Sequence, residues 1–332
     1  MMQVVDLLKK LVEIPSPSGH EDEIVEFLAN MLDEMGFDAI IQESEVRNII
    51  VNPEASVWVV THMDTVQTKS QFRFDGFYAY GTGVCDAKGS IAAILIALEK
   101  IDRLNIGIAL FSDEEENGRG SKLFIREYTP EKAIVMEPTS LKIANTHYGS
   151  LEVIVEIAGV SAHGSLPEYG DNAIEKAIGL INEIKSVDFT GKFSIQEMVG
   201  GSDEYVIPDY CKLRLDFVFP PDVRAAELRD MIVRVARKYG NAEIVEESDG
   251  FIEENLDVLE KALRKSGIGV EYTEMHSWTD AINLKNAGCR VVVWGPGELH
   301  NCHTERERVA IDEIVKAANV LINLNEIVRG SI

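Results

Sequence analysis

The chain has 332 residues, of which 45% are hydrophobic and 27% are charged. This composition is typical of a globular protein with a sizeable core, and it excludes disordered, fibrous and disulfide-stapled chains. The formal net charge of −24 disfavours nucleic acid and anionic membranes as partners. The four cysteines lack metal-knuckle spacing, and no signal peptide or membrane-length apolar run is found, so we expect a cytoplasmic protein.

Much of the chain alternates helices with continuous apolar strands. In chain order, the predicted elements are a helix at residues 1–14, a strand at 57–60, a helix at 89–101, a strand at 106–111, a helix at 121–127, and strands at 133–136 and 290–294. Continuous apolar strands separated by helices are typical of a parallel sheet that is covered on both faces. The sequence therefore predicts an α/β fold with a mostly parallel sheet sandwiched by helices.

The middle of the chain has a different pattern. Residues 151–157 and 213–219 alternate like half-exposed strands, whereas residues 172–185 and 223–239 have helical periodicity. This pattern indicates a smaller α+β domain inserted into the larger one. The predicted domains are residues 1–147 plus 249–332 and the insert 148–248.

Acidic and imidazole side chains follow the predicted buried strands. His62 and Asp64 follow the first strand, a run of four acids at residues 113–116 follows the second, and Glu137 follows the third. The fourth strand leads through a glycine loop into the sequence HNCHTERE. Because the carboxyl ends of parallel strands open into one crevice, we expect these residues to converge.

The converging residues predict a pair of divalent metal ions. Several carboxylates would lie together with no evident cationic neighbour, an arrangement that costs free energy unless a positive charge sits among them. Imidazole and carboxylate ligands without thiolate favour zinc, with cobalt or manganese as alternatives. His62 and Asp64 lie two residues apart on an extended segment, so we expect the Asp64 carboxylate to hold the second ring nitrogen of His62.

Six motifs in a fixed order carry a resemblance to a known family. They are THMDTV, GTGVCDAKG, SDEEENGRGS, VMEPTS, GVSAHGSLPEYGDNA and GPGELHNCHTERE. Together they resemble the metallopeptidase family of acetylornithine deacetylase, succinyl-diaminopimelate desuccinylase, acetyl-lysine deacetylase, aminoacylase and carboxypeptidase G. The resemblance covers essentially the whole chain. It implies a phosphorylase/hydrolase-like catalytic domain with two zinc ions bridged by a carboxylate and a water, and an inserted dimerisation or lid domain.

The resemblance also implies a role for individual residues. The positions that match the family's metal ligands are His62, Asp86, Glu115, Glu137 and His303, with Asp86 as the bridging ligand. Asp64 is implied as a catalytic residue, and Glu114 resembles the general base. His163 resembles the histidine that reaches a neighbouring subunit's active site, so we expect a homodimer formed through the inserted domain.

Two of these assignments have neighbouring alternatives. The roles of base and metal ligand are assigned to Glu114 and Glu115, and an error of one residue in this assignment stays open. Glu116 is expected to face solvent. His300 competes with His303 for the last ligand position. The family's HTxxE frame, formed here by Thr304 and Glu307, favours His303.

Asp86 lies in a glycine-rich segment, and Cys85 and Cys302 lie next to proposed ligands, but each of the three residues has a simple interpretation. The segment GTGVCDAKG lacks the spacing of a phosphate-binding loop, so Asp86 is better explained as a ligand. Cys85 and Cys302 adjoin proposed ligands, and we interpret them as small buried hydrophobic residues.

The insert departs from the family where relatives hold the substrate. Relatives commonly have an asparagine and an arginine where this chain has Tyr205 and Val218. A guanidinium binds a carboxylate through two parallel hydrogen bonds, and valine cannot. Arg214 lies on the same strand face as Val218 and is a possible substitute.

The expected function is hydrolysis of an N-acyl amino acid, as in the acetylornithine and acetyl-lysine deacetylases. The acidic protein field favours a basic amino acid product. A dipeptidase or aminopeptidase that uses the same metals is the close alternative, and a non-catalytic binding protein is the remote one. Some relatives release the amino acid from an acidic carrier protein, which would need a basic patch that the sequence does not locate.

Overall fold

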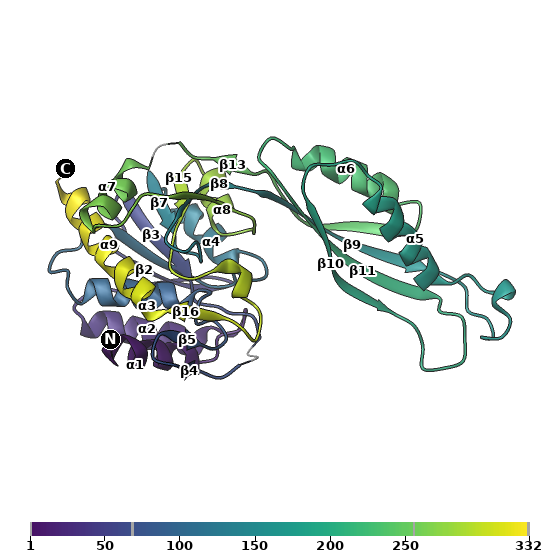
Figure 1. Ribbon diagram of the computed structural model, residues 1–332, viewed down its shortest axis with the longest axis horizontal. Helices are drawn as coiled ribbons and strands as arrows, with labels where there is room; N and C mark the ends of the chain where they lie inside the picture. The colour runs from purple at the N-terminus through teal and green to yellow at the C-terminus, as the bar shows by residue number, and fades with distance from the viewer. Residues whose placement is uncertain (1, 68–69, 255, 331–332) are drawn as a thin grey trace. The chain divides into compact units, whose positions relative to one another are not determined.

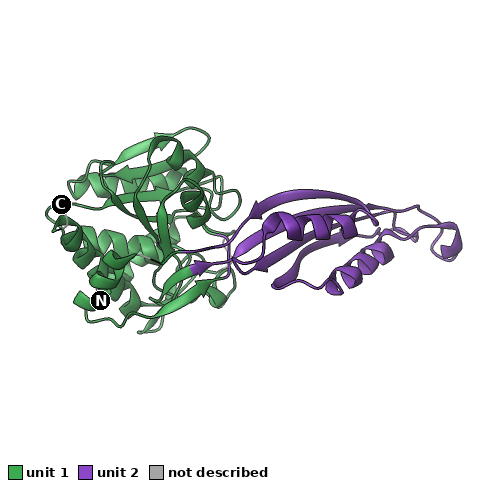
Figure 2. Cartoon of the chain, turned by 90° about the horizontal axis from the view of Figure 1, so that it is seen from above, with its two compact units in different colours: residues 1–145, 253–275, 279–332 green, residues 146–252, 276–278 purple. Residues whose placement is uncertain are grey.

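The computed structural model describes residues 2–67, 70–254 and 256–330. The chain divides into two compact units (Figure 2). Unit 1 comprises Met1–Asn145, Glu253–Met275 and Thr279–Ile332, and unit 2 comprises Thr146–Ile252 and His276–Trp278.

Unit 1 is built on a mixed sheet (Figure 1). Its strands are β1 (Ile40–Glu43), β2 (Arg47–Val51), β3 (Val57–His62), β6 (Gly107–Phe111), β7 (Lys132–Val135), β8 (Ile143–His147), β14 (Tyr272–Met275) and β15 (Arg290–Val293). The sheet ends with β13 (Phe251–Ile252), which pairs with the last two residues of β8 and belongs with them to unit 2. They follow the order β1-β2-β6-β3-β7-β15-β8-β13, and β14 pairs with β8. The central strands β6, β3, β7 and β15 are parallel, whereas β1, β2, β8 and β13 pair antiparallel. The expected mostly parallel sheet is therefore confirmed.

Helices cover both faces of this sheet. They are α1 (Met2–Glu13), α2 (Asp22–Glu34), α3 (Lys88–Leu98), α4 (Arg119–Glu127), α7 (Asp257–Lys265), α8 (Ala281–Asn286) and α9 (Ile311–Arg329). Helices α1, α3, α7 and α9 pack against one another, and α4 packs against α8. No helix of residues 2–67, 70–254 and 256–330 has the length and apolar character needed to cross a membrane.

Neighbouring side chains of β3 show how two faces of one strand become buried. Trp58 packs edge-on against Phe124 of α4, with ring centroids 5.0 Å apart. Val59 belongs instead to the core that contains α1, α3 and α9. Because successive strand residues point to opposite faces, a strand covered on both sides is apolar at every position. All six residues of β3 are buried, including His62 at its end.

A second, smaller sheet of unit 1 supports the loop that carries His303. It consists of β4 (Arg73–Phe74), β5 (Tyr78–Tyr80) and β16 (Arg308–Ala310). The strands follow the order β16-β5-β4, and both pairings are antiparallel. The short 3-10 helix η2 (Leu299–Asn301) precedes His303 in this loop.

Unit 2 is an antiparallel sheet with two helices packed on it. Its elements are β9 (Gly149–Ala158), the 3-10 helix η1 (Pro167–Tyr169), α5 (Ala173–Lys185), β10 (Lys192–Gly200), β11 (Tyr210–Phe219), α6 (Ala225–Ala236) and β12 (Asn241–Ser248). The strand order is β10-β11-β9-β12. Strands β9 and β11 alternate buried and more exposed residues, and their buried side chains form a core with α5 and α6. The sequence patterns did not predict β10 and β12, because most residues of these strands are not buried and leave little hydrophobic signal.

Candidate metal centre

The five expected ligand residues come together in unit 1. Two sets of side chains have atoms within 4.8 Å of one another: His62, Asp86 and Glu137 form one set, and Asp86, Glu115 and His303 form the other. Asp86 belongs to both sets. The shared carboxylate makes the arrangement suitable for two adjacent cations.

The Asp86 carboxylate lies between two imidazole rings. Its Oδ1 atom is 3.1 Å from Nε2 of His62, and its Oδ2 atom is 3.2 Å from Nε2 of His303. Nε2 of His62 is also 3.6 Å from Oε1 of Glu137, and Nε2 of His303 is 2.9 Å from Oε2 of Glu115. Each imidazole nitrogen therefore faces the bridging carboxylate and one further carboxylate.

The chemistry of the cluster fits divalent cations. The side chain of His303 is 48% exposed, whereas those of His62, Asp86, Glu115 and Glu137 are buried. Oε1 of Glu137 is buried without a hydrogen-bond partner. Among the described residues, no lysine or arginine forms an ion pair with these carboxylates. Nitrogen and oxygen donors around an uncompensated negative charge are a suitable ligand set for zinc.

Burial raises the pKa of the acidic groups in this cluster. Desolvation, aided by the nearby charge of Asp86, raises the pKa of Glu137 to about 8 despite the opposing effect of His62. Desolvation likewise raises the pKa of Glu114 well above its usual range, and the carboxylates of Glu137, Asp280 and Glu115 add to the shift. These carboxylates are thus poorly accommodated as anions unless a cation lies among them.

Asp64 holds the turn that carries Glu114 and Glu115. Its Oδ1 and Oδ2 atoms accept hydrogen bonds from the backbone N–H groups of Glu114 and Glu115, each at 3.0 Å. The hydroxyl of Ser18 donates a further hydrogen bond to Oδ2 at 2.7 Å. Nδ1 of His62 lies 2.9 Å from the Asp64 backbone carbonyl and 3.4 Å from Oδ1. The main-chain oxygen, rather than the expected carboxylate, is therefore the nearer partner of His62.

A partly buried ion pair fixes the same turn from its other side. Arg119 donates from Nε to Oδ2 of Asp113 at 2.6 Å and from its NH2 group to Oδ1 at 2.9 Å. Asp113 has a φ of +63°, a left-handed conformation that is uncommon for residues other than glycine. Tertiary contacts thus hold the turn in a shape that local preference does not favour.

Four residues next to the expected ligands lie outside the two ligand sets, namely His300, Cys85, Cys302 and Glu116. The His300 side chain is 74% exposed, and its Nε2 lies 4.0 Å from Glu298. Cys85 and Cys302 are free and buried, and their thiols contact each other. Glu116 is exposed, as expected.

The residues expected to contact substrate from the insert lie in unit 2. His163 is exposed, its Nδ1 is 2.7 Å from the Ser165 hydroxyl, and its ring packs edge-on against Tyr205 at 5.4 Å. Arg214 donates two hydrogen bonds to the Glu152 carboxylate, at 2.6 and 2.9 Å. Its guanidinium is therefore already paired, which weakens it as a substitute for the arginine that Val218 replaces.

One residue near the cluster, Asp280, was missed by the sequence analysis. Asp280 is buried, accepts a hydrogen bond from the Ser121 hydroxyl through Oδ1, and leaves Oδ2 without a partner. Burial raises the pKa of Asp280 to about 7 despite the hydrogen bond from Ser121. Asp280 directly precedes α8, and an acid before an apolar helix is ordinarily explained as a helix cap. The sequence carried no other signal for it.

The chain is similar to several known proteins. Residues 58–326 match the family described as Peptidase family M20/M25/M40. A Pyrobaculum aerophilum protein that bears the name "Putative [LysW]-lysine/[LysW]-ornithine hydrolase" is 28% identical, with 96% of each chain covered. A Mycobacterium tuberculosis protein that bears the name "Putative succinyl-diaminopimelate desuccinylase DapE" is 26% identical, with the same coverage of both chains. A tripeptidase from Staphylococcus aureus has a similar fold, with a TM-score of 0.79, 22% identity and 98% of each chain covered.

Proposed function

Because the chain belongs to the peptidase family M20/M25/M40, we propose that it is a metal-dependent hydrolase that cleaves the amide bond of an N-acyl amino acid. The observation that carries this proposal is the position of the Asp86 carboxylate between the imidazoles of His62 and His303. A carboxylate shared by two nitrogen and oxygen donor sets is a suitable bridge for a pair of divalent ions.

The residues that would hold the ions follow from the two sets of donors. His62, Asp86 and Glu137 would hold one ion, and Asp86, Glu115 and His303 would hold the other. Zinc is the proposed metal, with cobalt or manganese as alternatives. When bound, such a pair supplies Lewis acidity to the scissile carbonyl and to the attacking water.

Glu114 is the proposed general base. Its carboxylate would take a proton from the attacking water and later deliver it to the leaving amine. Burial raises its pKa, which makes it a stronger base than an exposed glutamate. The hydrogen bonds from the turn to Asp64 hold Glu114 in place for this transfer.

His163 and a homodimer complete the proposal. An imidazole N–H of His163 would stabilise the negative charge that develops on the scissile carbonyl oxygen. Support for a dimer comes from β10, an edge strand of unit 2 whose residues are exposed apart from Phe193. Its apolar residues Ile195, Met198 and Val199 are 39%, 43% and 50% exposed. An exposed apolar edge is suited to pairing with a strand of another chain.

The experiment that tests the function is a substrate panel with added zinc or cobalt. It contains N-acetylornithine, N-acetyl-lysine, N-succinyl-diaminopimelate and dipeptides. We expect hydrolysis of at least one N-acyl amino acid, and loss of that activity after chelation. Cleavage of dipeptides alone would favour a dipeptidase or aminopeptidase instead.

Two glutamate variants test the assignment of the base. Glu114→Gln should retain metal and lose about 10²- to 10⁴-fold in kcat. Glu116→Gln, which changes an exposed neighbour in the same way, should keep wild-type kcat. A Glu114→Gln variant that binds metal and hydrolyses substrate at the wild-type rate would contradict the assignment.

A further inference from the structure

The backbone around His163 is fixed by contacts between two loops of unit 2. One loop follows β9, and the other joins β10 to β11. The N–H of Gly164 donates to the Tyr205 carbonyl at 2.9 Å. The N–H of Ile207 donates to the Ala162 carbonyl at 2.8 Å. Tertiary contacts therefore hold the main chain on both sides of His163.

The side chain of His163 is held by the residue two positions further along the chain. The Ser165 hydroxyl lies 2.7 Å from Nδ1 of His163, and the backbone N–H of Ser165 donates to the same nitrogen at 3.3 Å. Because a backbone N–H can only donate, Nδ1 must present its lone pair to Ser165. A proton on Nδ1 would point at the hydrogen of that N–H, so the Ser165 hydroxyl is a donor as well.

This contact decides which ring nitrogen of the neutral imidazole carries the proton. A neutral imidazole has one N–H donor and one acceptor, and the hydrogen bonds of one nitrogen fix the state of the other. With Nδ1 as the acceptor, the proton lies on Nε2. Among the residues that the structure describes, none forms a hydrogen bond with Nε2 of His163. Its N–H is therefore available to a ligand.

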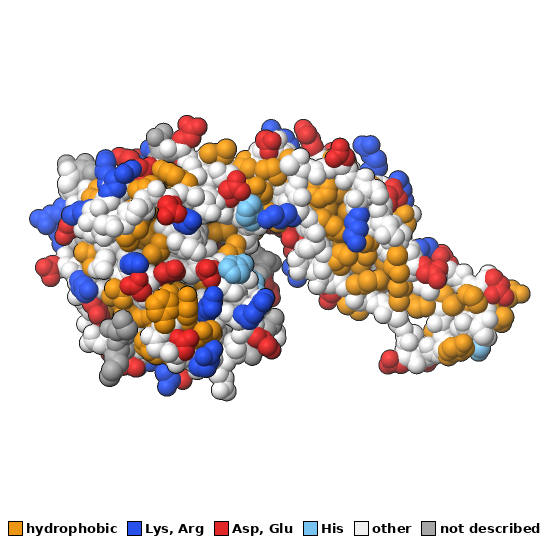
Figure 3. Space-filling view, in the orientation of Figure 1, with side chains coloured by type: hydrophobic (Ala, Val, Ile, Leu, Met, Phe, Trp, Pro, Cys, Tyr) orange, Lys and Arg blue, Asp and Glu red, His pale blue; other side chains and the backbone are white. Residues whose placement is uncertain are grey.

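Tyr205 supports the same imidazole from a second side. The two rings pack edge-on with centroids 5.4 Å apart, and a Cβ atom at Gly164 would lie 3.1 Å from Cδ1 of Tyr205. Leu166, Tyr169 and Tyr205 are 45%, 74% and 71% exposed. Figure 3 shows hydrophobic and imidazole side chains at the surface of this end of unit 2. Apolar neighbours that exclude water strengthen a hydrogen bond to a developing charge.

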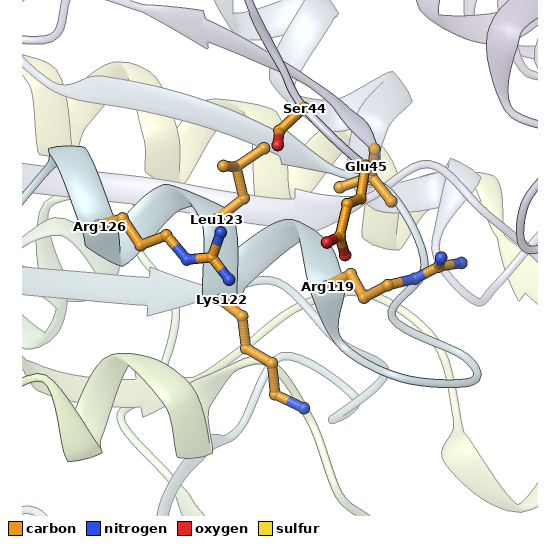
Figure 4. Close-up of a pocket in the computed structure, with 7 residues that line it drawn as sticks. Ser44, Glu45, Arg119, Lys122, Leu123 and Arg126 are labelled. Carbon is orange, nitrogen blue, oxygen red and sulfur yellow. The ribbon is translucent and has the colours of Figure 1, made fainter.

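The basic side chains of α4 are the other candidate donors beside the Glu114 turn. A cavity of about 150 Å³ is lined on this helix by Arg119, Lys122 and Arg126 (Figure 4). Arg119 adjoins the turn, but its guanidinium donates two hydrogen bonds to the Asp113 carboxylate. The Lys122 ammonium donates to a backbone carbonyl and turns away from the other labelled side chains in Figure 4. Arg126 lies about 10 Å further along the helix axis. These positions favour His163 over α4 as the source of the proposed donor.

We propose that Ser165 is a positioning residue that fixes His163 as an Nε2–H donor to the scissile carbonyl oxygen. The inference rests on the proposed function, which assigns to His163 the stabilisation of negative charge on this oxygen. A donor that is oriented before the reaction stabilises the developing charge without a cost of reorganisation. Ser165 acts only through the imidazole and does not touch the substrate.

Substitutions of two serines test this role with an N-acyl amino acid that the wild-type protein hydrolyses. Ser165→Ala should lower kcat about 10-fold and leave KM unchanged, because the imidazole is then less well oriented. Ser165→Thr keeps the hydroxyl and should restore most of kcat. Ser161→Ala is the matched control, since the Ser161 hydroxyl donates to Asp209 instead, and it should keep wild-type kcat. Wild-type kcat in Ser165→Ala, or an equal loss in Ser161→Ala, would overturn the proposal.

A double variant shows whether Ser165 acts through His163. His163→Ala removes the proposed donor and should lower kcat about 10²- to 10³-fold. In the His163→Ala background, Ser165→Ala should cause no further loss, because two residues that act as one unit are not additive. A further 10-fold loss in the double variant would overturn the proposal, since it would show that Ser165 acts independently of the imidazole.

A spectroscopic measurement tests the tautomer without relying on activity. In protein labelled with 15N in its histidines, NMR distinguishes a ring nitrogen that carries a proton from one that does not. The signals of His163 are those that disappear in His163→Ala. At about pH 8.5, where an ordinary imidazole is neutral, we expect a protonated Nε2 and an unprotonated Nδ1. Ser165→Ala should shift the Nδ1 signal, and Ser161→Ala should leave it unchanged.

The spectrum separates failure of this inference from failure of the proposed function. A protonated Nδ1 in the wild-type protein, or an Nδ1 signal that stays the same in Ser165→Ala, would overturn the contact between Ser165 and His163. If the wild-type protein hydrolyses no N-acyl amino acid or dipeptide, the proposed function fails, and with it the role of the contact in catalysis. The predicted tautomer would then still be supported or overturned by the spectrum alone.

Discussion

The carboxylate of Glu307 supports the backbone that presents Asp86. Its Oε1 atom accepts hydrogen bonds from the N–H groups of Cys85 and Asp86, at 3.0 and 3.2 Å, across 221 residues of sequence between Glu307 and Asp86. The proposed bridging ligand is thus held by a residue of the loop that also carries His303. Both proposed ion sites use Asp86, so Glu307 supports both of them.

Removal of this support should weaken metal binding. Glu307→Ala leaves two buried N–H groups without an acceptor, and loss of such a supporting contact typically lowers metal affinity about 10- to 100-fold. Metal content after dialysis against a graded chelator series measures the effect. Glu305→Ala removes an exposed carboxylate of the same loop and should leave metal content unchanged. Equal retention of metal by both variants would show that Glu307 has no supporting role.

Asp64→Asn should misplace the proposed base without removing the ligands. An asparagine presents an NH2 group where one carboxylate oxygen now accepts the N–H of Glu114 or Glu115, so one hydrogen bond becomes a repulsion. We expect kcat to fall about 10²-fold, the loss associated with a small misplacement of a catalytic group. Asp102→Asn, at an exposed position, is the control for the loss of one charge. Wild-type kcat in Asp64→Asn would contradict this role.

Stability at acidic pH should depend on His147. This ring stacks on Phe251 with centroids 5.1 Å apart, and burial lowers its pKa from 6.5 to about 4 despite its hydrogen bond to the Tyr148 carbonyl. Between pH 4 and 6.5 the unfolded chain binds a proton that the folded chain does not bind. The free energy of unfolding therefore falls as the pH falls through this window, by about 2 kcal/mol between pH 7 and pH 5.

Urea unfolding of metal-free protein at pH 7 and pH 5 measures this contribution. His147→Phe should lose less stability on acidification than wild type, because phenylalanine cannot bind the proton. His20→Phe, which changes an exposed histidine, should follow the wild-type dependence. The same loss of stability in all three proteins would exclude His147 as the source.

The proposed dimer should depend on the β10 edge. Val199→Lys places a charge on the exposed apolar part of this strand, and charged residues on an edge oppose strand pairing. We expect the variant to be a monomer by light scattering at concentrations where wild type is a dimer. Val245→Lys changes a valine of similar exposure on β12, the opposite edge, and should leave the dimer intact. A monomeric wild-type protein would remove the basis for this prediction.

Local patterns explain how much of unit 1 could be predicted. The apolar runs around Val59 and Ala109 identify buried strands because a strand covered on both faces is apolar throughout. The ends of parallel strands meet, so His62 and Glu137 could be expected to approach each other from their positions alone. In unit 2, by contrast, the exposed strand β10 lacked such an apolar pattern and was not predicted.

The sequence by itself determined the parallel sheet and the residues that gather at its edge, since both follow from short-range periodicity and from motifs that stand directly after strands. Only the tertiary structure decided which partner each of these residues has. Glu307 reaches Asp86, and Asp64 holds the turn of Glu114. These contacts join segments far apart in the chain, and their geometry depends on how the loops pack rather than on any local preference.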